Sequence, residues 1–281
     1  IPGDWTKSWL INIYKGKEDA MDCGSYRGVK VLEHSLKVFE RVIEARVRKS
    51  IVIDDMQFGF RAGKGTTDAI FIVRQLQEKY LHVKKDLWMA FMDLEKAFDR
   101  VPRAVLWWTL REAGMEEGLI TVIKAMYEGA RTAVKVKGSE SKEFEVKVGV
   151  HQGSVLSPQL FIIVMEALSR RFKRGLPYEL LYADDLVLMA DTELALLDRI
   201  RVWKESLEAK GLRVNMGKTK VMRCRDRSEN IVKSGKFPCG VCKKGVGSNS
   251  IQCRQCQNWI HKKCSNIKGR LRQDAIFKCE R

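Results

Sequence analysis

Apolar residues extend from Leu180 to Ala190 and are interrupted by two adjacent carboxylates, Asp184 and Asp185. Two apolar segments separated by a short polar segment are typical of a β-hairpin with buried strands and a tight turn. Two neighbouring carboxylates at a turn repel each other unless a cation neutralises them, so the pattern indicates a divalent metal. The alternative is an ordinary solvated Asp-Asp turn.

A second apolar stretch, residues 87–92, also ends at an acid, Asp93. One carboxylate from a strand and two from a neighbouring hairpin form the ligand set that a two-metal nucleotidyl-transfer site requires. In such a site one ion activates the attacking hydroxyl and the other stabilises the leaving group.

The remaining periodicity predicts an α+β fold. Alternating or short continuous apolar runs predict strands at residues 9–14, 132–136, 144–148 and 212–222. Apolar positions every three or four residues predict helices at 31–47, 66–80, 102–113, 117–128, 157–168 and 192–210. In the hairpin expected from 132–136 and 144–148, the alternation predicts that one face is buried.

Composition narrows the class of protein. The chain has 281 residues, 45% of them hydrophobic and 31% charged, which supports a packed core and argues against disorder. The net charge of +17 favours a polyanion such as nucleic acid over a small neutral substrate. No apolar run approaches the ~20 residues that span a membrane, and no signal peptide is visible. Because the chain begins at Ile1 and stops abruptly, we expect it to be a fragment.

Six of the eight cysteines follow residue 238, which indicates metal ligation in a reducing compartment rather than disulfides. Close Cys/His pairs at this spacing predict zinc. The seven candidate ligands are Cys239, Cys242, Cys253, Cys256, His261, Cys264 and Cys279. A polar stretch precedes them, so we expect three parts: a main domain at 1–224, a linker at 225–236 and a zinc-binding module at 237–281.

Two glycine-containing loops can approach a ligand closely. Residues 57–65 carry two cations but do not match a P-loop, and the same residues also form ordinary turns. Gln152 and Gly153 combine a donor and acceptor with a permissive backbone, and His151 before them is expected to be a hydrogen-bonding loop residue. Arg27 and Lys30 are candidates for phosphate contacts, with a solvated face as the alternative.

Six stretches, taken in order, resemble a reverse transcriptase of the non-LTR (LINE-type) retrotransposon family. They are Ser25–Gly28, Gln57–Arg61, Phe91–Asp93 with Ala97–Asp99, Gln152–Gly153 with Leu156–Pro158, Tyr182–Asp185, and Gly211–Leu212 with Asn215 and Lys218–Thr219. The resemblance covers residues 8–224. It implies the fingers and palm of a right-handed polymerase, an antiparallel sheet backed by helices, acting on an RNA template, a DNA primer and dNTPs.

The resemblance implies that Asp93, Asp184 and Asp185 are catalytic carboxylates that bind two Mg²⁺ ions. It matches Lys218 to a lysine that protonates the leaving pyrophosphate, as a cation placed there physically can. The alternative for Lys218 is a solvated surface lysine.

The resemblance also implies substrate contacts. Phe98 matches a bulky side chain under the incoming sugar that excludes a 2′-hydroxyl; the alternative is a core aromatic. Arg27 and Arg61 match positions that hold the triphosphate, and Gln152 and Gly153 match the loop that lines the nucleotide and template pocket.

The chain departs from the family pattern at two positions, where His151 and Val155 replace the usual Arg and Pro. No thumb is evident after Lys220, and the endonuclease that such elements often encode upstream is absent. An inactive polymerase remnant that binds nucleic acid or chromatin is therefore the alternative function. A palm-type nucleotide cyclase is disfavoured, because the template-pocket loop and the basic fingers would have no purpose.

The cysteine-rich tail resembles a truncated plant-homeodomain (PHD) finger. The interleaved pattern of such fingers implies one complete zinc site and a second site that lacks its last ligand. The first would use Cys239, Cys242, His261 and Cys264, and the second Cys253, Cys256 and Cys279. The resemblance implies a buried Trp259, a nuclear location and a chromatin or histone-tail partner. Phe237 is the only aromatic-cage candidate, so methyl-lysine binding is disfavoured, and the basic tail favours nucleic acid equally.

Overall fold

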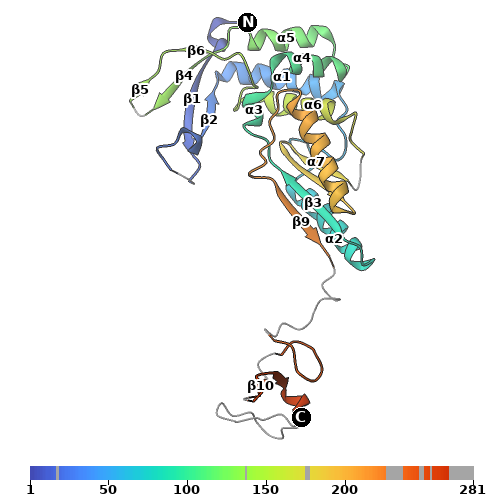
Figure 1. Cartoon of the computed structure of the whole chain (residues 1–281). Coiled ribbons are helices and arrows are strands. Elements are labelled where there is room, and N and C mark those ends of the chain that lie inside the picture. Colours follow the sequence, from blue (N-terminus) through green and yellow to red (C-terminus); the bar gives the residue numbers. More distant parts are fainter. Residues whose placement is uncertain are drawn as a thin grey trace. The chain divides into compact units, whose positions relative to one another are not determined.

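The computed structural model describes residues 1–16, 19–136, 138–174, 178–225, 237–246, 250–253 and 255–265. Contacts divide the chain into an N-terminal unit, residues 1–224, and a C-terminal unit, residues 225–281. Each unit is described by itself. Figure 1 shows β1 (Lys7–Tyr14), β2 (Tyr26–Val31) and β4 (Arg131–Val136) together at one end of the N-terminal unit. At the other end are β3 (Leu87–Met92), β9 (Lys220–Cys224) and α2 (Thr66–His82).

The central sheet of the N-terminal unit has four antiparallel strands in the order β7-β8-β3-β9. Their bounds are β3 (Leu87–Met92), β7 (Glu179–Tyr182), β8 (Asp185–Ala190) and β9 (Lys220–Cys224). The expected hairpin is confirmed, since β7 and β8 pair from Glu179↔Leu188 to Tyr182↔Asp185. Alternate side chains of β3 and β8 belong to two different apolar clusters. The two inner strands, β8 and β3, are therefore covered on both faces, which explains why they are almost continuously apolar.

A second sheet carries strands in the order β2-β1-β4-β5, and β6 also pairs with β4. The bounds are β1 (Lys7–Tyr14), β2 (Tyr26–Val31), β4 (Arg131–Val136), β5 (Ser139–Glu140) and β6 (Phe144–Glu145). β1 pairs antiparallel with β2 and parallel with β4. The parallel pair joins segments more than 100 residues apart, which no local pattern predicts.

Two expectations for this sheet were wrong. The helix expected from residue 31 begins at His34, because Val29 and Val31 pair with β1 as strand residues. The hairpin face expected to be buried is open: Val136 is 57% exposed, Phe144 45% and Val148 49%. Only the inner end of β4 packs on the core, since Thr132 and Ala133 are buried there. Alternation of apolar and polar residues shows that a strand has two different faces, but it does not show whether a second layer covers the apolar face.

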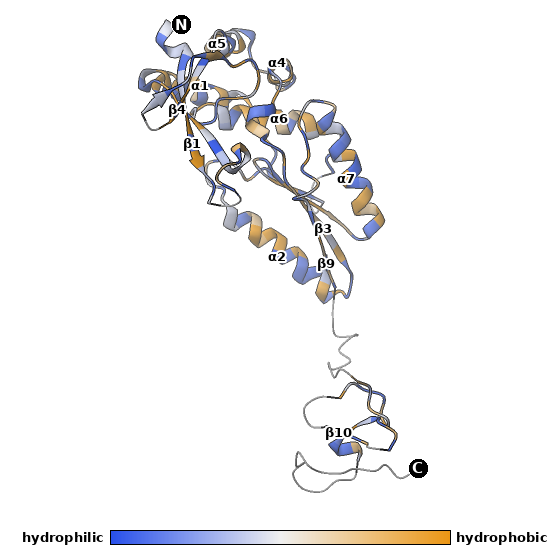
Figure 2. Cartoon of the chain, turned by 60° about the vertical axis from the view of Figure 1, so that its left-hand side comes forward, coloured by the Kyte–Doolittle hydropathy of each residue, from blue (hydrophilic) through white to orange (hydrophobic). Residues whose placement is uncertain are grey.

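The helices agree closely with the predicted periodicity. They are α1 (His34–Ser50), α2 (Thr66–His82), α3 (Ala97–Arg100), α4 (Arg103–Glu112), α5 (Glu117–Tyr127), α6 (Ser157–Ser169) and α7 (Glu193–Glu208), with short 3₁₀ helices η1 (Gly3–Thr6), η2 (Cys23–Ser25) and η3 (Lys262–Cys264). Figure 2 shows hydrophobic and hydrophilic patches alternating along α2 and α7. At the ends of α7, the Thr192 side chain accepts a hydrogen bond from the Ala195 amide, and Gly211 follows with a φ of +88°. These two residues are the N-cap and the C-terminal stop of the helix that the sequence predicts over residues 192–210.

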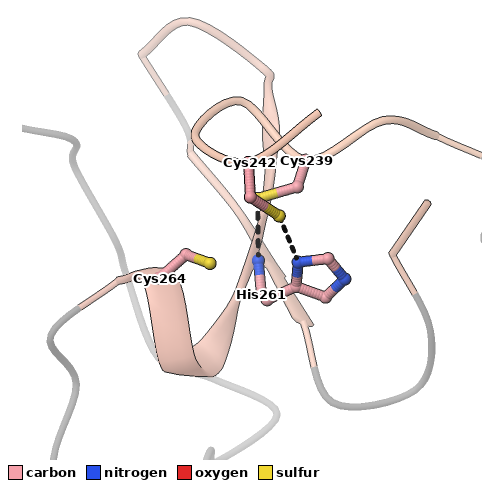
Figure 3. Close-up of side chains that lie close together, drawn as sticks. All are labelled: Cys239, Cys242, His261 and Cys264. Atoms are coloured by element: carbon pink, nitrogen blue, oxygen red, sulfur yellow. Dashed lines mark hydrogen bonds between the residues drawn. The ribbon is translucent and has the colours of Figure 1, made fainter. Parts of the chain in front are cut away.

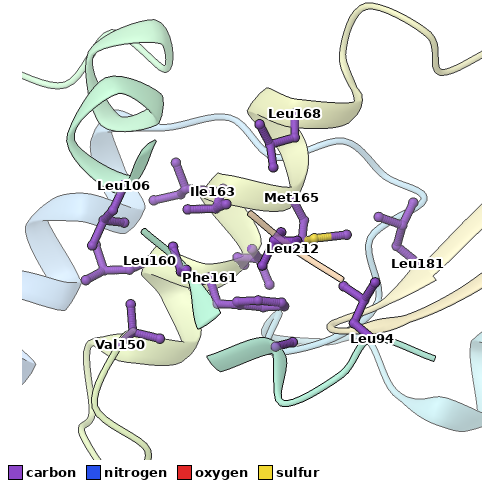
Figure 4. Close-up of a cluster of buried hydrophobic side chains, with 14 of the residues drawn as sticks. Leu94, Leu106, Val150, Leu160, Phe161, Ile163, Met165, Leu168, Leu181 and Leu212 are labelled. Atoms are coloured by element: carbon purple, nitrogen blue, oxygen red, sulfur yellow. The ribbon is translucent and has the colours of Figure 1, made fainter. Parts of the chain in front are cut away.

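Helix α6 is the centre of the core, with 10 of its 13 residues buried. It contacts α1, α4 and α7. Figure 4 shows Leu160, Ile163 and Met165 of α6 in one cluster with Leu106 and Leu212. A helix that is buried on nearly all sides fixes the loop that leads into it, residues 149–156.

The described part of the C-terminal unit contains a small antiparallel hairpin of β10 (Ser250–Gln252) and β11 (Trp259–His261). Trp259 is half-buried rather than fully buried, and its ring stacks on Phe237 at 5.7 Å. Residues 226–236 of the expected linker lie outside the described residues, as does Cys279. Within the part of the chain that the structure describes, no helix is both long and apolar enough to span a membrane.

Candidate active site and metal centre

Three carboxylates from distant parts of the sequence meet at one end of the central sheet. Asp93 directly follows β3, and Asp184 and Asp185 lie at the β7–β8 turn. Because Met92 pairs with Leu186, the next position places Asp93 opposite Asp185 on an adjacent strand, at a strand spacing of about 4.8 Å. The sheet register therefore brings together the carboxylates that the sequence suggested.

The electrostatics of this group show mutual repulsion. Burial raises the pKa of Asp184, and the Asp93 charge raises it further. Burial also raises the pKa of Asp185, with additional contributions from Asp184 and Asp93. Divalent cations relieve such repulsion, and clustered carboxylate oxygens are the ligands that Mg²⁺ prefers. The donor set therefore fits the expected metal.

A lysine lies beside the three carboxylates. The Lys218 ammonium lies 3.6 Å from Asp93 Oδ2. The backbone connects the same two segments, since the Asn215 amide donates to the Asp93 carbonyl at 2.8 Å, and the Lys218 amide donates to Asn215 Oδ1 at 3.2 Å. This places Lys218 within reach of groups bound at the carboxylates.

Phe98 in α3 is half-buried. Its ring stacks on Phe161 with centroids 4.7 Å apart and meets Phe60 edge-on at 6.1 Å. The ring is thus supported by the core on one side and keeps some exposed surface. This geometry is compatible with both expected roles, the core aromatic and the sugar gate.

The loop at Gln152 and Gly153 is attached to β2. The Lys30 amide donates to the Gln152 carbonyl at 2.8 Å. Gly153 has a φ of +110°, and a Cβ there would lie 2.3 Å from the Lys30 carbonyl oxygen, so only glycine fits. On the same strand, Arg27 is close enough to Asp184 for its charge to lower the pKa of that carboxyl. The structure therefore brings Arg27, this loop and the carboxylates to one region.

Arg61 makes a different set of contacts. Its Nη1 donates to the carbonyls of Ile53 at 3.0 Å and Asp54 at 2.7 Å, and lies 3.6 Å from Asp55 Oδ1. These bonds stabilise the loop to which Arg61 belongs. Its expected triphosphate contact stays a prediction.

His151 is buried, and its ring packs on the Tyr127 ring at 4.5 Å. Burial, and then the charges of Lys30 and Arg103, hold its pKa well below the usual range, so the imidazole is neutral. A buried ring packed on an aromatic side chain supports the loop, and its low pKa makes it a weak proton acceptor.

Sequence reasoning missed Glu40, which is 3% exposed and anchors the same loop. Its carboxylate accepts hydrogen bonds from Ser154 Oγ at 2.7 Å and the Val155 amide at 2.8 Å. Burial raises the pKa of Glu40, and these bonds oppose the rise. One signal was available: Glu40 stands four residues after Leu36 and three before Ile43, on the apolar face of α1.

The C-terminal unit holds a compact group of potential metal ligands. The ligand atoms of Cys239, Cys242, His261 and Cys264 all lie within 4.8 Å of one another. Figure 3 shows the four side chains gathered together. Among the described residues this is the one group so tightly gathered. Cys253 and Cys256 are described but do not belong to it.

The chemistry of this group fits zinc. His261 Nε2 lies 2.9 Å from the Gly245 carbonyl oxygen, which can only accept, so Nε2 carries the proton. Nδ1 then carries a free lone pair, and this nitrogen lies 3.4 Å from Cys242 Sγ. Burial alone would raise the pKa of Cys239, but nearby backbone amides lower it to about 6, which favours the thiolate. Three thiolates and one neutral imidazole form a tetrahedral zinc ligand set.

Comparison with known families gives one extended match. The sequence model of the family described as "Reverse transcriptase (RNA-dependent DNA polymerase)" matches residues 14–264. A Pol polyprotein from the R2DM retrotransposable element of Drosophila melanogaster is 32% identical over 206 residues, covering 69% of this chain and 19% of the relative. The RNA-directed DNA polymerase from the mobile element jockey of Drosophila funebris is 32% identical over 158 residues, covering 55% of this chain and 17% of the relative. The chain thus spans about a fifth of the length of the curated relatives it matches.

Solved structures show the same fold. Telomerase from Candida tropicalis, in complex with a fragment of telomeric RNA, superimposes with a TM-score of 0.59 at 16% identity, covering 79% of this chain and 42% of that chain. The apo form of that telomerase gives a TM-score of 0.57 at 16% identity, covering 78% and 45%. At this identity the likeness concerns the fold alone, and it confirms the expected α+β architecture.

Proposed function

The chain belongs to the reverse transcriptase (RNA-dependent DNA polymerase) family, with relatives in non-LTR retrotransposons, and we propose that it catalyses RNA-templated DNA synthesis by two-metal nucleotidyl transfer. One observation carries the proposal: the pairing of β3 with β8 places Asp93 beside Asp185 at the β7–β8 turn. Two Mg²⁺ ions bound to Asp93, Asp184 and Asp185 would activate the primer hydroxyl and neutralise charge on the leaving group.

In the proposed reaction the primer 3′-hydroxyl gives up its proton to solvent water, its oxygen forms a bond to the α-phosphorus of a dNTP, and the bond from that phosphorus to the pyrophosphate oxygen breaks. The leaving pyrophosphate gains negative charge as the bond breaks. Lys218, whose ammonium lies 3.6 Å from Asp93, would give it a proton as general acid. The distance supports this role because it places the donor at the carboxylate group.

The substrate contacts follow from the same region. Arg27, whose charge acts on Asp184, would bind the triphosphate. Phe98, supported from behind by Phe161, would block a 2′-hydroxyl and so favour deoxynucleotides. Gln152 and Gly153 would line the nucleotide and template pocket, and Arg61 would assist at the triphosphate.

Primer extension tests this function directly. The full chain is incubated with a DNA primer annealed to an RNA template, dNTPs and Mg²⁺, and Asp184→Asn serves as the matched inactive variant. We expect extension by the wild type and a loss of at least about 1,000-fold in Asp184→Asn, because the metal loses a charged ligand. Equal extension by both proteins would reveal a contaminating polymerase and contradict the proposal.

We further propose that Cys239, Cys242, His261 and Cys264 bind Zn²⁺ as the first site of a PHD-type finger. Cys253, Cys256 and Cys279 would belong to the second, interleaved site. The finger would give the protein a nuclear role by contacting nucleic acid or a histone tail.

A second candidate function is nucleic-acid binding without catalysis. The net charge of +17 favours it independently of the carboxylates, and His151 and Val155 depart from the family pattern. Binding of primer–template that weakens steeply with salt, without extension by the wild type, would favour this candidate.

A further inference from the structure

The backbone of the β7–β8 turn is held by a side chain from a distant loop. Gln57 is 2% exposed, and its Oε1 accepts hydrogen bonds from the Ala183 amide at 2.9 Å and from the Gly59 amide at 2.8 Å. Ala183 immediately precedes the catalytic pair Asp184 and Asp185. A buried amide group thus contacts the turn itself, 126 residues along the chain.

The main chain around Gln57 runs along β7. The Phe58 amide donates to the Leu181 carbonyl at 2.8 Å, and the Leu181 amide donates to the Met56 carbonyl at 2.9 Å. Residue 57 therefore forms a parallel bridge to Leu181 at the outer edge of the central sheet. This pairing fixes where the Gln57 side chain reaches the turn.

Gly59 allows this close approach. A Cβ on residue 59 would lie 2.3 Å from the Ala183 nitrogen and 2.8 Å from the Ala183 Cβ, both shorter than a van der Waals contact. The obstacle is backbone rather than a flexible side chain, so the turn or the loop would have to move. Any side chain at 59 would therefore displace the turn that carries the carboxylates.

The turn needs such support because its conformation is intrinsically unfavourable. Ala183 has a φ of 58°, in the left-handed region that residues with a Cβ seldom adopt. Ala183 is also 3% exposed, so its amide would lack a water partner if Gln57 did not accept its hydrogen bond. If the turn opened, Ala183 could leave the left-handed region and its amide could bind water. Opening would also move Asp184 and Asp185.

We infer that Gln57 and Gly59 are positioning residues: they hold the β7–β8 turn in its left-handed conformation and so set the carboxylates of Asp184 and Asp185 for metal binding. The inference rests on the proposed function, since it concerns the same carboxylates. It assigns to Gln57 and Gly59 an action through Ala183, without contact to substrate.

The experiment compares Mn²⁺ binding by the zinc-loaded full chain, measured by electron paramagnetic resonance, in two variants with matched controls. Gln57→Leu removes the acceptor at similar size, and Gln159→Leu is the control, because Gln159 is equally buried at 2% and its Oε1 has no partner among the described residues. Gly59→Ala adds the clashing Cβ, and Gly65→Ala is its control, because a Cβ at 65 meets only Asp68 Oδ2 at 3.8 Å. Asp184→Asn gives the background from other sites.

We expect Gln57→Leu and Gly59→Ala to weaken Mn²⁺ binding about 10-fold or more, as loss of an orienting partner does in other metal sites, while both controls bind like the wild type. Amide hydrogen exchange in the peptide that spans residues 180–186 should accelerate in the same two variants and not in the controls. In primer extension, kcat should fall while the KM for dNTP stays near the wild-type value.

Wild-type Mn²⁺ binding and unchanged exchange in folded Gln57→Leu and Gly59→Ala would overturn the inference. Loss of the cooperative thermal transition in both variants would also overturn it, since the segment would then support the fold rather than position the turn. If the wild type binds Mn²⁺ at the carboxylates but extends no primer, the proposed function fails while the metal titration still decides the inference.

Discussion

The ammonium nitrogen of Lys218 lies 3.6 Å from a carboxylate oxygen of Asp93, although 125 residues separate them in the sequence. The contact does not depend on the long lysine side chain alone. An isolated bridge between Leu94 and Val214, with the bond from the Asn215 amide to the Asp93 carbonyl, ties the two backbones together. The fold itself therefore places a cation beside one of the three carboxylates that we propose to bind metal.

Replacing Lys218 should slow chemistry more than binding. If its ammonium protonates the pyrophosphate, Lys218→Ala should lower the single-turnover rate about 100-fold, and Lys218→Arg should recover little, because a guanidinium releases its proton poorly. Rapid-quench measurements at saturating and limiting dNTP separate rate from affinity. A variant that keeps the wild-type rate but loses dNTP affinity would assign Lys218 to charge neutralisation instead.

Shortening Phe98 should relax the choice of sugar. Phe98→Val removes the ring expected to block a 2′-hydroxyl, so the preference for dNTP over the matching rNTP, as a ratio of kcat/KM, should fall about 10-fold or more. Phe172→Leu is the control, because it removes an aromatic contact, with Trp203, that does not involve Phe98. Both variants should lose about 1 kcal/mol or more of stability from the aromatic pair that each disrupts. Equal discrimination in Phe98→Val and wild type would leave Phe98 a core aromatic.

The stability of the metal-free protein should depend on the charges at the β7–β8 turn. The pKa of Asp185 is raised above its ordinary value of 3.8, so the unfolded chain releases this proton more readily than the folded one. Folding is therefore disfavoured as the pH rises above about 4, and this penalty is absent below that pH. Asp185→Asn should be more stable than wild type at pH 7 without divalent ions, by about 1 kcal/mol or less after allowance for solvent screening.

Thermal unfolding at several pH values checks this prediction. The advantage of Asp185→Asn should shrink as the pH falls below about 4 and vanish well below that pH, where the carboxyl is neutral in both states. Added Mg²⁺ should stabilise the wild type and reverse the order, because binding to the folded state alone adds stability. A variant less stable than wild type at pH 7 would show that Asp185 makes a favourable contact outweighing its repulsion.

Loss of zinc from the Cys/His ligand group should not affect the stability of the N-terminal unit. Cys242→Ser should lower bound zinc by one equivalent per chain, measured by elemental mass spectrometry, because three ligands hold zinc weakly. Cys224→Ser is the control, since Cys224 lies in β9 outside the ligand group. Unfolding of the N-terminal unit should be unchanged in Cys242→Ser. Undiminished zinc in Cys242→Ser would place the ion elsewhere.

Local pattern was sufficient for the elements of the core. Continuous apolar runs ending at Asp93 and at Asp184 predicted the two strands and the hairpin, because a strand buried on both faces has no polar alternation. Thr192 and Gly211 bounded α7 for reasons that act within a few residues. Close Cys/His pairs likewise predicted zinc ligands near the C-terminus, and the resemblance to a PHD finger implied the grouping of Cys239, Cys242, His261 and Cys264 that the structure shows.

Tertiary structure decided what depends on distant partners. The exposure of Val136 and Phe144 follows from what covers the second sheet, and alternation along β4 and β6 is the same whether that face is covered or open. In the sequence Gln57 looks like an ordinary polar loop residue. In the folded chain it lies beside β7, where its side chain accepts a hydrogen bond from the Ala183 amide. The sequence thus determined which residues are candidates for the chemistry, because side-chain type and spacing are local. Only the folded chain determined which residues hold them in place, because that depends on backbone groups brought within hydrogen-bonding distance from far along the chain.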